Sequence, residues 1–226
     1  MKAMTHKVPG DKHGLYSHSI HLAHRCLSPP YQQRWLAQME GEMPDMKQQL
    51  IRRIKAIDGK LRKLKQLNGY EHIEPKPHPP ASEAEISTYE AYLGVALPPS
   101  YRTFLSLYDG YEWLAYPGHI LSIQDLMPNG KWHTAMLEWR RVSARCGAPE
   151  VARGIVIANM GQANNWVYLD ASCRDAKTGD YRVVEWEPEE TAEYDDLLAF
   201  LEECEKTIQY GLDEATGLAG GEDDDD

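Results

Sequence analysis

A proline-rich segment divides this sequence in two. Residues 74–82, EPKPHPPAS, hold four prolines in nine positions. Because proline fixes φ and lacks a backbone N–H, neither a helix nor a central strand can run through such a segment. We therefore predict a linker over 74–81, which separates an N-terminal extension over 1–73 from a folded domain over 82–210. The remaining residues, 211–226, end in GGEDDDD and are predicted to form an acidic, disordered tail.

The extension contains one strongly amphipathic segment, residues 46–67. Its apolar residues recur at spacings of three and four, which is the pattern of a helix with one buried stripe. They are Met46, Leu50, Ile54, Ile57, Leu61, Leu64 and Leu67. The opposite face is basic, and Gly59 weakens the helix by about 1 kcal/mol relative to alanine. The stripe must be covered, so we expect this helix to pack on the main domain, on a second copy of itself or on a partner.

Positive and negative charges are unevenly distributed along the chain, and the change of sign lies in the proline-rich segment. Residues 1–80 carry 14 Lys or Arg against 7 Asp or Glu, a net +7, whereas residues 81–226 carry 10 against 28, a net −18. The acidic part would repel nucleic-acid phosphates and attract a basic protein surface. The basic helix could contact phosphates, but the opposite charges favour packing on its own acidic domain or self-association through residues 46–67. We therefore predict a protein partner and no direct nucleic-acid binding.

Downstream of the linker, helices precede and follow a set of short strands. Ser82 and Glu85 form a capping-box pattern for a helix that ends at Gly94, and a second helix begins at Pro98-Pro99. Two further helices are predicted over 132–142 and 194–208. Strands rich in β-branched and aromatic residues are predicted over 119–123, 153–159, 165–170 and 181–187. We predict an α+β fold with an antiparallel sheet and helices packed on one of its faces.

No motif for catalysis is recognisable. The sequence contains no GxSxG, HExxH, phosphate-binding loop or GxGxxG, so we predict neither an enzyme nor a bound cofactor. The dense acids of residues 185–196 are interpreted as a solvated face that speeds encounter with a basic partner, rather than as paired catalytic carboxylates. The polar stretch 159–166 is interpreted as a hairpin loop rather than a ligand pocket.

Three histidines near the N-terminus are candidate zinc ligands. His18, His21 and His24 are spaced by three residues, with Cys26 close behind. No second ligand pair at zinc-site spacing is evident, so no metal site is predicted and the segment is interpreted as a surface or partner-contacting region. The four cysteines form no CxxC pair, no secretory signal is recognisable, and no run of eighteen apolar residues occurs. We therefore expect a cytoplasmic protein with reduced thiols and no membrane contact.

The ordered motifs after the linker resemble the SUKH superfamily, the Smi/Knr-like proteins. The family pattern is I..(Y/L)E..LG..LP..YR.FL...(N/D)G. In this sequence its positions are filled by Ile86, Tyr89, Glu90, Leu93, Gly94, Leu97, Pro98, Tyr101, Arg102, Phe104, Leu105, Asp109 and Gly110. The later segments IVIA, WVYLD and VVEWEPEE, followed by YDDLLAFLEE, are also similar to the family. The resemblance spans about residues 82–208 and leaves the basic extension outside the family pattern.

The resemblance implies an immunity protein. Members of this superfamily mostly bind a cognate bacterial polymorphic toxin, often a nuclease or another enzyme with cytoplasmic targets, and so protect the producing cell. Binding would block the toxin's active site or its substrate path, and the immunity protein itself needs no catalytic residues. A minority of the superfamily are eukaryotic regulatory scaffolds. The alternative function is therefore a scaffold or regulatory protein that assembles through its N-terminal helix.

Candidate contact residues follow from how protein interfaces work. A few buried Trp, Tyr or Arg residues supply most of the affinity, and acidic neighbours would fit a basic partner. The candidates are Tyr111, Glu112, Trp113, Asn164, Trp166, Asp170, Glu185, Glu187, Glu189 and Glu190. The tryptophans could equally pack in the core, and for Trp166 the sequence does not separate the two roles.

Overall fold

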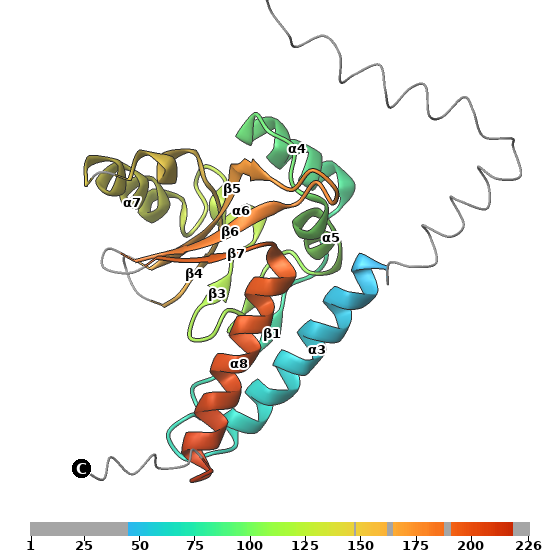
Figure 1. The fold of residues 1–226 in the computed structure, drawn as a ribbon, viewed down its shortest axis with the longest axis vertical. Coiled ribbons are helices and arrows are strands. Elements are labelled where there is room, and N and C mark those ends of the chain that lie inside the picture. The colour runs from blue at the N-terminus through green and yellow to red at the C-terminus, as the bar shows by residue number, and fades with distance from the viewer. Residues whose placement is uncertain (1–44, 147, 162–164, 188–190, 219–226) are drawn as a thin grey trace, which may run out of the picture. The chain divides into compact units, whose positions relative to one another are not determined.

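The computed structural model describes residues 45–146, 148–161, 165–187 and 191–218. Seven strands of this part of the chain form one antiparallel sheet, in which each strand pairs with the next along the sequence (Figure 1). They are β1 (Lys76–Pro77), β2 (Tyr111–Glu112), β3 (His119–Ile120), β4 (Ile155–Asn159), β5 (Trp166–Arg174), β6 (Tyr181–Trp186) and β7 (Thr191–Tyr194). The predicted α+β class with an antiparallel sheet is confirmed.

Helices precede, interrupt and follow the sheet. They are α3 (Met46–Lys65), α4 (Glu83–Leu93), α5 (Pro99–Leu107), α6 (Ile123–Leu126), α7 (His133–Arg145), the 3₁₀ helix η1 (Pro149–Arg153) and α8 (Leu197–Ala215). The predicted capping box starts α4, because Ser82 Oγ accepts the Glu85 N–H and the Glu85 carboxylate accepts the Ser82 N–H. Gly94 ends α4 at φ 70°, a left-handed conformation that glycine adopts without steric cost.

Helices cover both faces of the sheet. Side chains alternate between the faces of a strand, so the paired Trp166 and Trp186 lie on one face. There Trp139 of α7 packs on both rings, with centroids 5.6 and 5.7 Å away. Tyr194 of β7 lies on the opposite face, where its ring packs on Phe200 of α8 at 5.5 Å. The prediction of helices on one face only is therefore wrong, since α7 buries the second face through its tryptophan.

The proline-rich segment is hydrogen bonded to the folded domain. β1 lies at the edge of the sheet and pairs with β2. The His78 N–H donates to the Gly110 carbonyl at 3.1 Å, and the Ala81 N–H donates to the Leu105 carbonyl at 2.9 Å. An edge strand tolerates proline because one row of its backbone groups needs no partner strand. The segment predicted as a linker thus contains a short edge strand.

The amphipathic helix α3 packs along α8 of the same chain (Figure 1). Its stripe is at most 2% exposed and consists of Leu50, Ile54, Ile57, Leu61 and Leu64. Arg53 of α3 pairs with Glu202 and Glu205 of α8 at 3.1 and 2.5 Å, and Lys60 pairs with Glu205 at 3.0 Å. Of the three expected occupants of the stripe, the structure shows the chain's own domain. Self-association through residues 46–67 would require α3 to leave α8.

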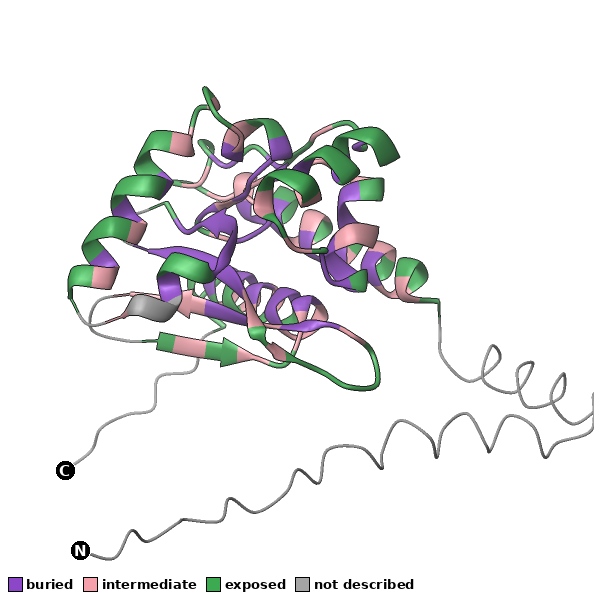
Figure 2. Ribbon diagram, turned by 90° about the horizontal axis from the view of Figure 1, so that it is seen from above, coloured by how far each residue is buried: buried purple, intermediate pink, exposed green. Residues whose placement is uncertain are grey.

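Both boundaries of the folded domain differ from those predicted from the sequence. Ile73, placed in the extension, is fully buried in the same core as the domain. α8 continues to Ala215, so residues 211–215 of the predicted tail are helical, and Leu212 is 9% exposed. Figure 2 shows the buried residues of helices and strands facing one another across this shared interior. The core thus extends in both directions beyond the boundaries that proline and charge patterns indicate.

Candidate functional site

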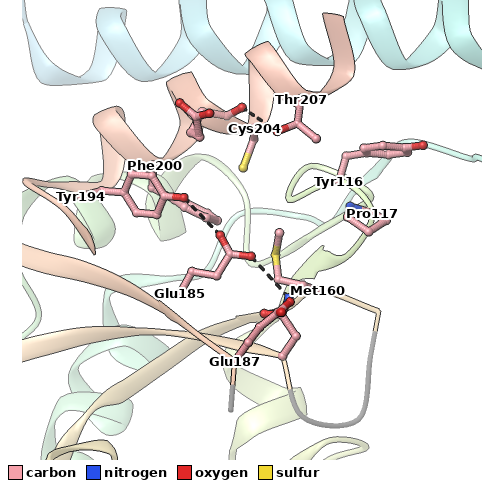
Figure 3. Close-up of a pocket in the computed structure, with 11 residues that line it drawn as sticks. Tyr116, Pro117, Met160, Glu185, Glu187, Tyr194, Phe200, Cys204 and Thr207 are labelled. Carbon is pink, nitrogen blue, oxygen red and sulfur yellow. Dashed lines mark hydrogen bonds between the residues drawn. The ribbon is translucent and has the colours of Figure 1, made fainter. Parts of the chain in front are cut away.

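A pocket of about 230 Å³ lies beside the N-terminal half of α8 (Figure 3). Its walls come from segments far apart in the sequence: the residues before β3, the ends of β4, β5 and β6, the strand β7, and α8. The lining residues are Tyr116, Pro117, Met160, Asn165, Glu185, Glu187, Tyr194, Phe200, Glu203, Cys204 and Thr207. Apolar and aromatic walls therefore surround a group of three glutamates.

The pairing of β6 and β7 brings Glu185 to this pocket. Glu185 pairs with Ala192, so it lies on the same face of the sheet as Tyr194, which is the face that α8 covers. The Tyr194 hydroxyl donates to Glu185 Oε2 at 3.2 Å (Figure 3). Glu187 directly follows the last residue of β6 and also lines the pocket.

Asn165 links Glu185 and Glu187. Its Nδ2 donates to Glu187 and, at 3.4 Å, to Glu185. Its own backbone is held in place, because the Asn165 carbonyl accepts the Met160 N–H at 3.0 Å and the Asn159 side-chain amide at 3.2 Å. Asn165 thereby fixes the position of both carboxylates at the pocket wall.

The pocket is rich in hydrogen-bond acceptors. Three carboxylates line it, and the Asn165 side chain, which is 6% exposed, has a buried Oδ1 with no donor among the described residues. The hydroxyls of Tyr194 and Thr207 already donate, to Glu185 and to the Glu203 carbonyl. Such a set of acceptors is complementary to a ligand that carries several N–H donors.

Two neighbouring groups are held in their neutral forms. Burial, and next the nearby Glu185 carboxylate, raise the pKa of the Cys204 thiol. The same two causes raise the pKa of Tyr194. Because the thiolate is the reactive form of cysteine, a thiol in this setting is not an activated nucleophile. Cys204 instead packs as a small apolar side chain on the buried face of α8 and is 4% exposed.

The predicted contact residues occupy three separate places. Glu185 and Glu187 line the pocket and are half-buried, not fully solvated as the acidic run suggested. Asn164, Glu189 and Glu190 lie outside the described residues, as do the candidate zinc ligands His18, His21 and His24. Of the predicted contact residues, the pocket contains Glu185 and Glu187. It also contains Asn165, the neighbour of the predicted Asn164.

A second group lies on and after β2. Tyr111 is 3% exposed, and its hydroxyl donates to Asp58 of α3 at 2.8 Å, so it joins the sheet to that helix. Glu112 lies 3.7 Å from Lys76 and 3.4 Å from His78 at the sheet edge. Trp113 is half-buried at φ 69°, and its ring packs against His119 at 5.3 Å.

A third group lies on β5. Trp166 is 1% exposed and belongs to an aromatic cluster with Trp132, Trp139 and Trp186, so its side chain lies in the core. Asp170 accepts from the Ser172 hydroxyl at 2.6 Å and pairs with Arg182 at 3.4 Å. The structure does not bring this group together with the pocket, since Trp166 projects from the opposite face of the sheet to Glu185.

Sequence reasoning missed most of the pocket wall. Tyr116, Met160 and Phe200 carry no motif that marks a binding site. One usable signal is the spacing of Phe200, Glu203 and Thr207 along the last helix, which places these residues on one helical face. Glu203 and Thr207 flank the buried face of that helix, and an acid at the edge of a core face is the feature that could have indicated a lined pocket.

The described part of the chain contains neither a cluster of metal-ligating side chains nor a membrane-spanning helix. No three His, Cys, Asp or Glu side chains there are grouped as ligands of a metal ion. None of the helices described is long and apolar enough to cross a membrane.

The sequence model of the SMI1 / KNR4 family (SUKH-1) matches residues 80–203, which is more than half of the chain. The match begins in the proline-rich segment and ends within α8, so it includes the whole sheet from β2 onward and leaves α3 outside. No curated protein matches the chain.

Proposed function

Because the chain belongs to the SMI1/KNR4 (SUKH-1) family, whose members commonly act as immunity proteins, we propose that it binds and neutralises a cognate bacterial toxin domain. The observation that carries the proposal for this chain is the acceptor-rich pocket on an acidic domain. Residues 81–226 have a net charge of −18, the whole chain including the basic α3 has −11, and three glutamates line the pocket beside α8. These features fit a basic protein surface, which a toxin that acts on nucleic acid would present.

To neutralise a toxin, the chain must bind it but need not catalyse any reaction. A complementary face that covers the toxin's active site or substrate path abolishes its activity for as long as the complex lasts. Specific interfaces of this kind bury about 1,200–2,000 Å² in total, far more than the pocket alone supplies. The pocket is therefore proposed as the centre of a larger contact area that includes neighbouring acidic residues of β6 and α8.

The scaffold alternative predicts assembly through the N-terminal helix. That helix would have to present its apolar stripe to another molecule. In the structure the stripe is covered by α8, which weakens the support for this function. The immunity function needs no such rearrangement.

The proposal is tested by protection in cells. A candidate toxin domain, sought among the genes adjacent to this one, is expressed under a repressible promoter, with and without the chain. Growth is expected to recover when the chain is present, and the two proteins are expected to co-purify. A chain with Tyr101→Asp in its core serves as an unfolded control. Failure of the folded chain to bind this toxin domain would sink the proposal.

A further inference from the structure

We propose that the pocket seats the guanidinium group of an arginine that projects from the partner protein. This inference rests on the proposed function, because it names the group by which a basic partner is recognised. Its starting point is the pocket of Figure 3, where Glu185 and Glu187 lie beside each other and face the space next to α8. The side chains of the polar wall and of the apolar wall together restrict which ligand the pocket can bind.

The polar wall offers acceptors. Glu185 and Glu187 contribute carboxylates, and Glu203 contributes one that already pairs with Lys206 of its own helix at 3.2 Å. The buried Oδ1 of Asn165 lacks a donor within the described residues. A buried acceptor without a donor costs free energy, so an incoming donor that reaches it is favoured. The Asn165 amide orientation is defined, because its Nδ2 donates to Glu187 and Glu185. The atom without a donor among the described residues is therefore the amide oxygen of Asn165. A ligand group that bonds to it must be a hydrogen-bond donor.

The apolar wall fits a flat, weakly hydrated cation on an aliphatic stem. Tyr116, Pro117, Met160 and Phe200 line the same pocket as the carboxylates. Guanidinium groups stack on aromatic rings, and the methylene groups of an arginine side chain pack on apolar surface. A volume of about 230 Å³ accommodates one side chain but not a folded segment.

Arginine fits this donor pattern better than lysine or a metal ion. Its guanidinium presents five N–H donors in one plane and pairs with carboxylates through two parallel hydrogen bonds. The lysine ammonium is a compact, strongly hydrated charge with three donors. The glutamates of the pocket are not grouped as metal ligands. We therefore assign the pocket to a partner arginine and not to a divalent cation.

The test is a double-mutant cycle with the toxin domain of the preceding section. In the chain, Glu187→Gln removes one charge but keeps an acceptor for Asn165. Glu138→Gln on α7 is the matched control, since Glu138 is exposed and pairs only with Arg141 of its own helix among the described residues. In the toxin domain, each surface arginine is replaced in turn by lysine. Affinities are measured by calorimetry, and thermal unfolding confirms that each variant is folded.

We expect Glu187→Gln to weaken binding about tenfold or more, and Glu138→Gln to leave it unchanged. One arginine-to-lysine variant of the toxin domain should weaken binding to a similar extent, and much less when the chain already carries Glu187→Gln. That coupling identifies the seated arginine.

Three results would overturn this inference while leaving the proposed function intact. The first is tight binding in which Glu187→Gln and Glu138→Gln behave alike. The second is a complex in which no toxin arginine couples to Glu187. The third is micromolar binding of free L-arginine by the chain alone, which would assign the pocket to a small molecule. Absence of any complex would instead refute the proposed function itself.

Discussion

At the scale of single residues, half-buried carboxylates accept hydrogen bonds from backbone groups and so join loops to helices. Glu90 accepts the Leu97 N–H at 2.9 Å and closes the turn between α4 and α5. Asp109 accepts the Ile123 N–H at 2.8 Å and holds the start of α6. Both acids belong to the motif that resembles the SUKH superfamily. The motif therefore specifies how the scaffold is built, and the residues of the pocket come from elsewhere in the chain.

Asp180 is expected to be the most costly acid to remove. It is 1% exposed, and its Oδ1 accepts the N–H of Ser100, the second residue of α5, at 2.8 Å. The N-cap residue of α5 is Pro98, which offers no side-chain cap, and a carboxylate at a helix N-terminus is favoured by the helix dipole. Asp180→Ala should lower the unfolding free energy by about 1.5–3 kcal/mol in urea titrations. The exposed control Glu138→Ala should change it by less than about 0.5 kcal/mol, and equal effects would contradict this role.

His119 makes stability depend on pH. Burial lowers its pKa from the ordinary 6.5, with Glu112 opposing the shift, and its Nδ1 accepts the Trp113 N–H at 3.0 Å. Below about pH 6.5 the unfolded chain takes up a proton that the folded chain resists, so this contribution to stability is present at neutral pH and falls with acidification.

The variant His119→Asn keeps an acceptor for Trp113 but does not titrate. Its unfolding free energy should fall less than that of the parent chain between about pH 7.5 and pH 5.5. Urea unfolding at the two pH values gives the comparison. Parallel losses in both proteins would show that other groups cause the pH dependence.

At the scale of elements, helices were predictable where their ends are encoded locally. The capping box of α4, Gly94 and the proline start of α5 all follow from short-range chemistry. The edge strand β1 was not predictable, because two residues carry no periodicity and proline argues against a strand. The buried face of α7 is narrower than its apolar residues indicate, since Met136 and Trp139 are buried but Val142 is 42% exposed. Which part of a helical face is buried depends on the neighbour it meets.

Two glycines, one inside a helix and one at a helix end, should respond oppositely to replacement by alanine. Gly59 lies inside α3, and no neighbouring atom lies within 4 Å of the position that a Cβ would take, so Gly59→Ala should stabilise the chain by about 1 kcal/mol through helix propensity. Gly94 has equal space but φ 70°, so Gly94→Ala should destabilise by about 1–2 kcal/mol. Thermal and urea unfolding provide the measurement. Changes of the same sign at both positions would contradict the backbone explanation.

At the scale of the whole molecule, the pocket exists only because distant segments meet. Glu185 and Glu187 were recognisable from an acidic run, but their half-burial depends on α8 lying over that face of the sheet. Tyr116 and Phe200 are 84 positions apart in the sequence and share the pocket through tertiary packing alone. The charge pattern favoured either packing of α3 on the acidic domain or self-association, and the structure shows the first. Which residues line the pocket could not be predicted without the folded chain.

The net charge predicts a high association rate constant with a basic partner. The net charge of −11 carried by the chain as a whole should accelerate association with a basic toxin domain. The association rate constant, measured by stopped-flow fluorescence, should fall by about tenfold or more between about 50 mM and 500 mM salt, because ions screen the long-range attraction. A rate constant that does not change with salt would exclude electrostatic steering.

The most direct test of the account is a titration of toxin activity with the purified chain. Activity of the adjacent-gene toxin domain should fall to background near one equivalent of chain. Glu187→Gln should shift the titration to higher concentrations, and Glu138→Gln should superimpose on the parent curve. Full toxin activity in the presence of excess folded chain would contradict the central claim that this protein neutralises its partner by binding.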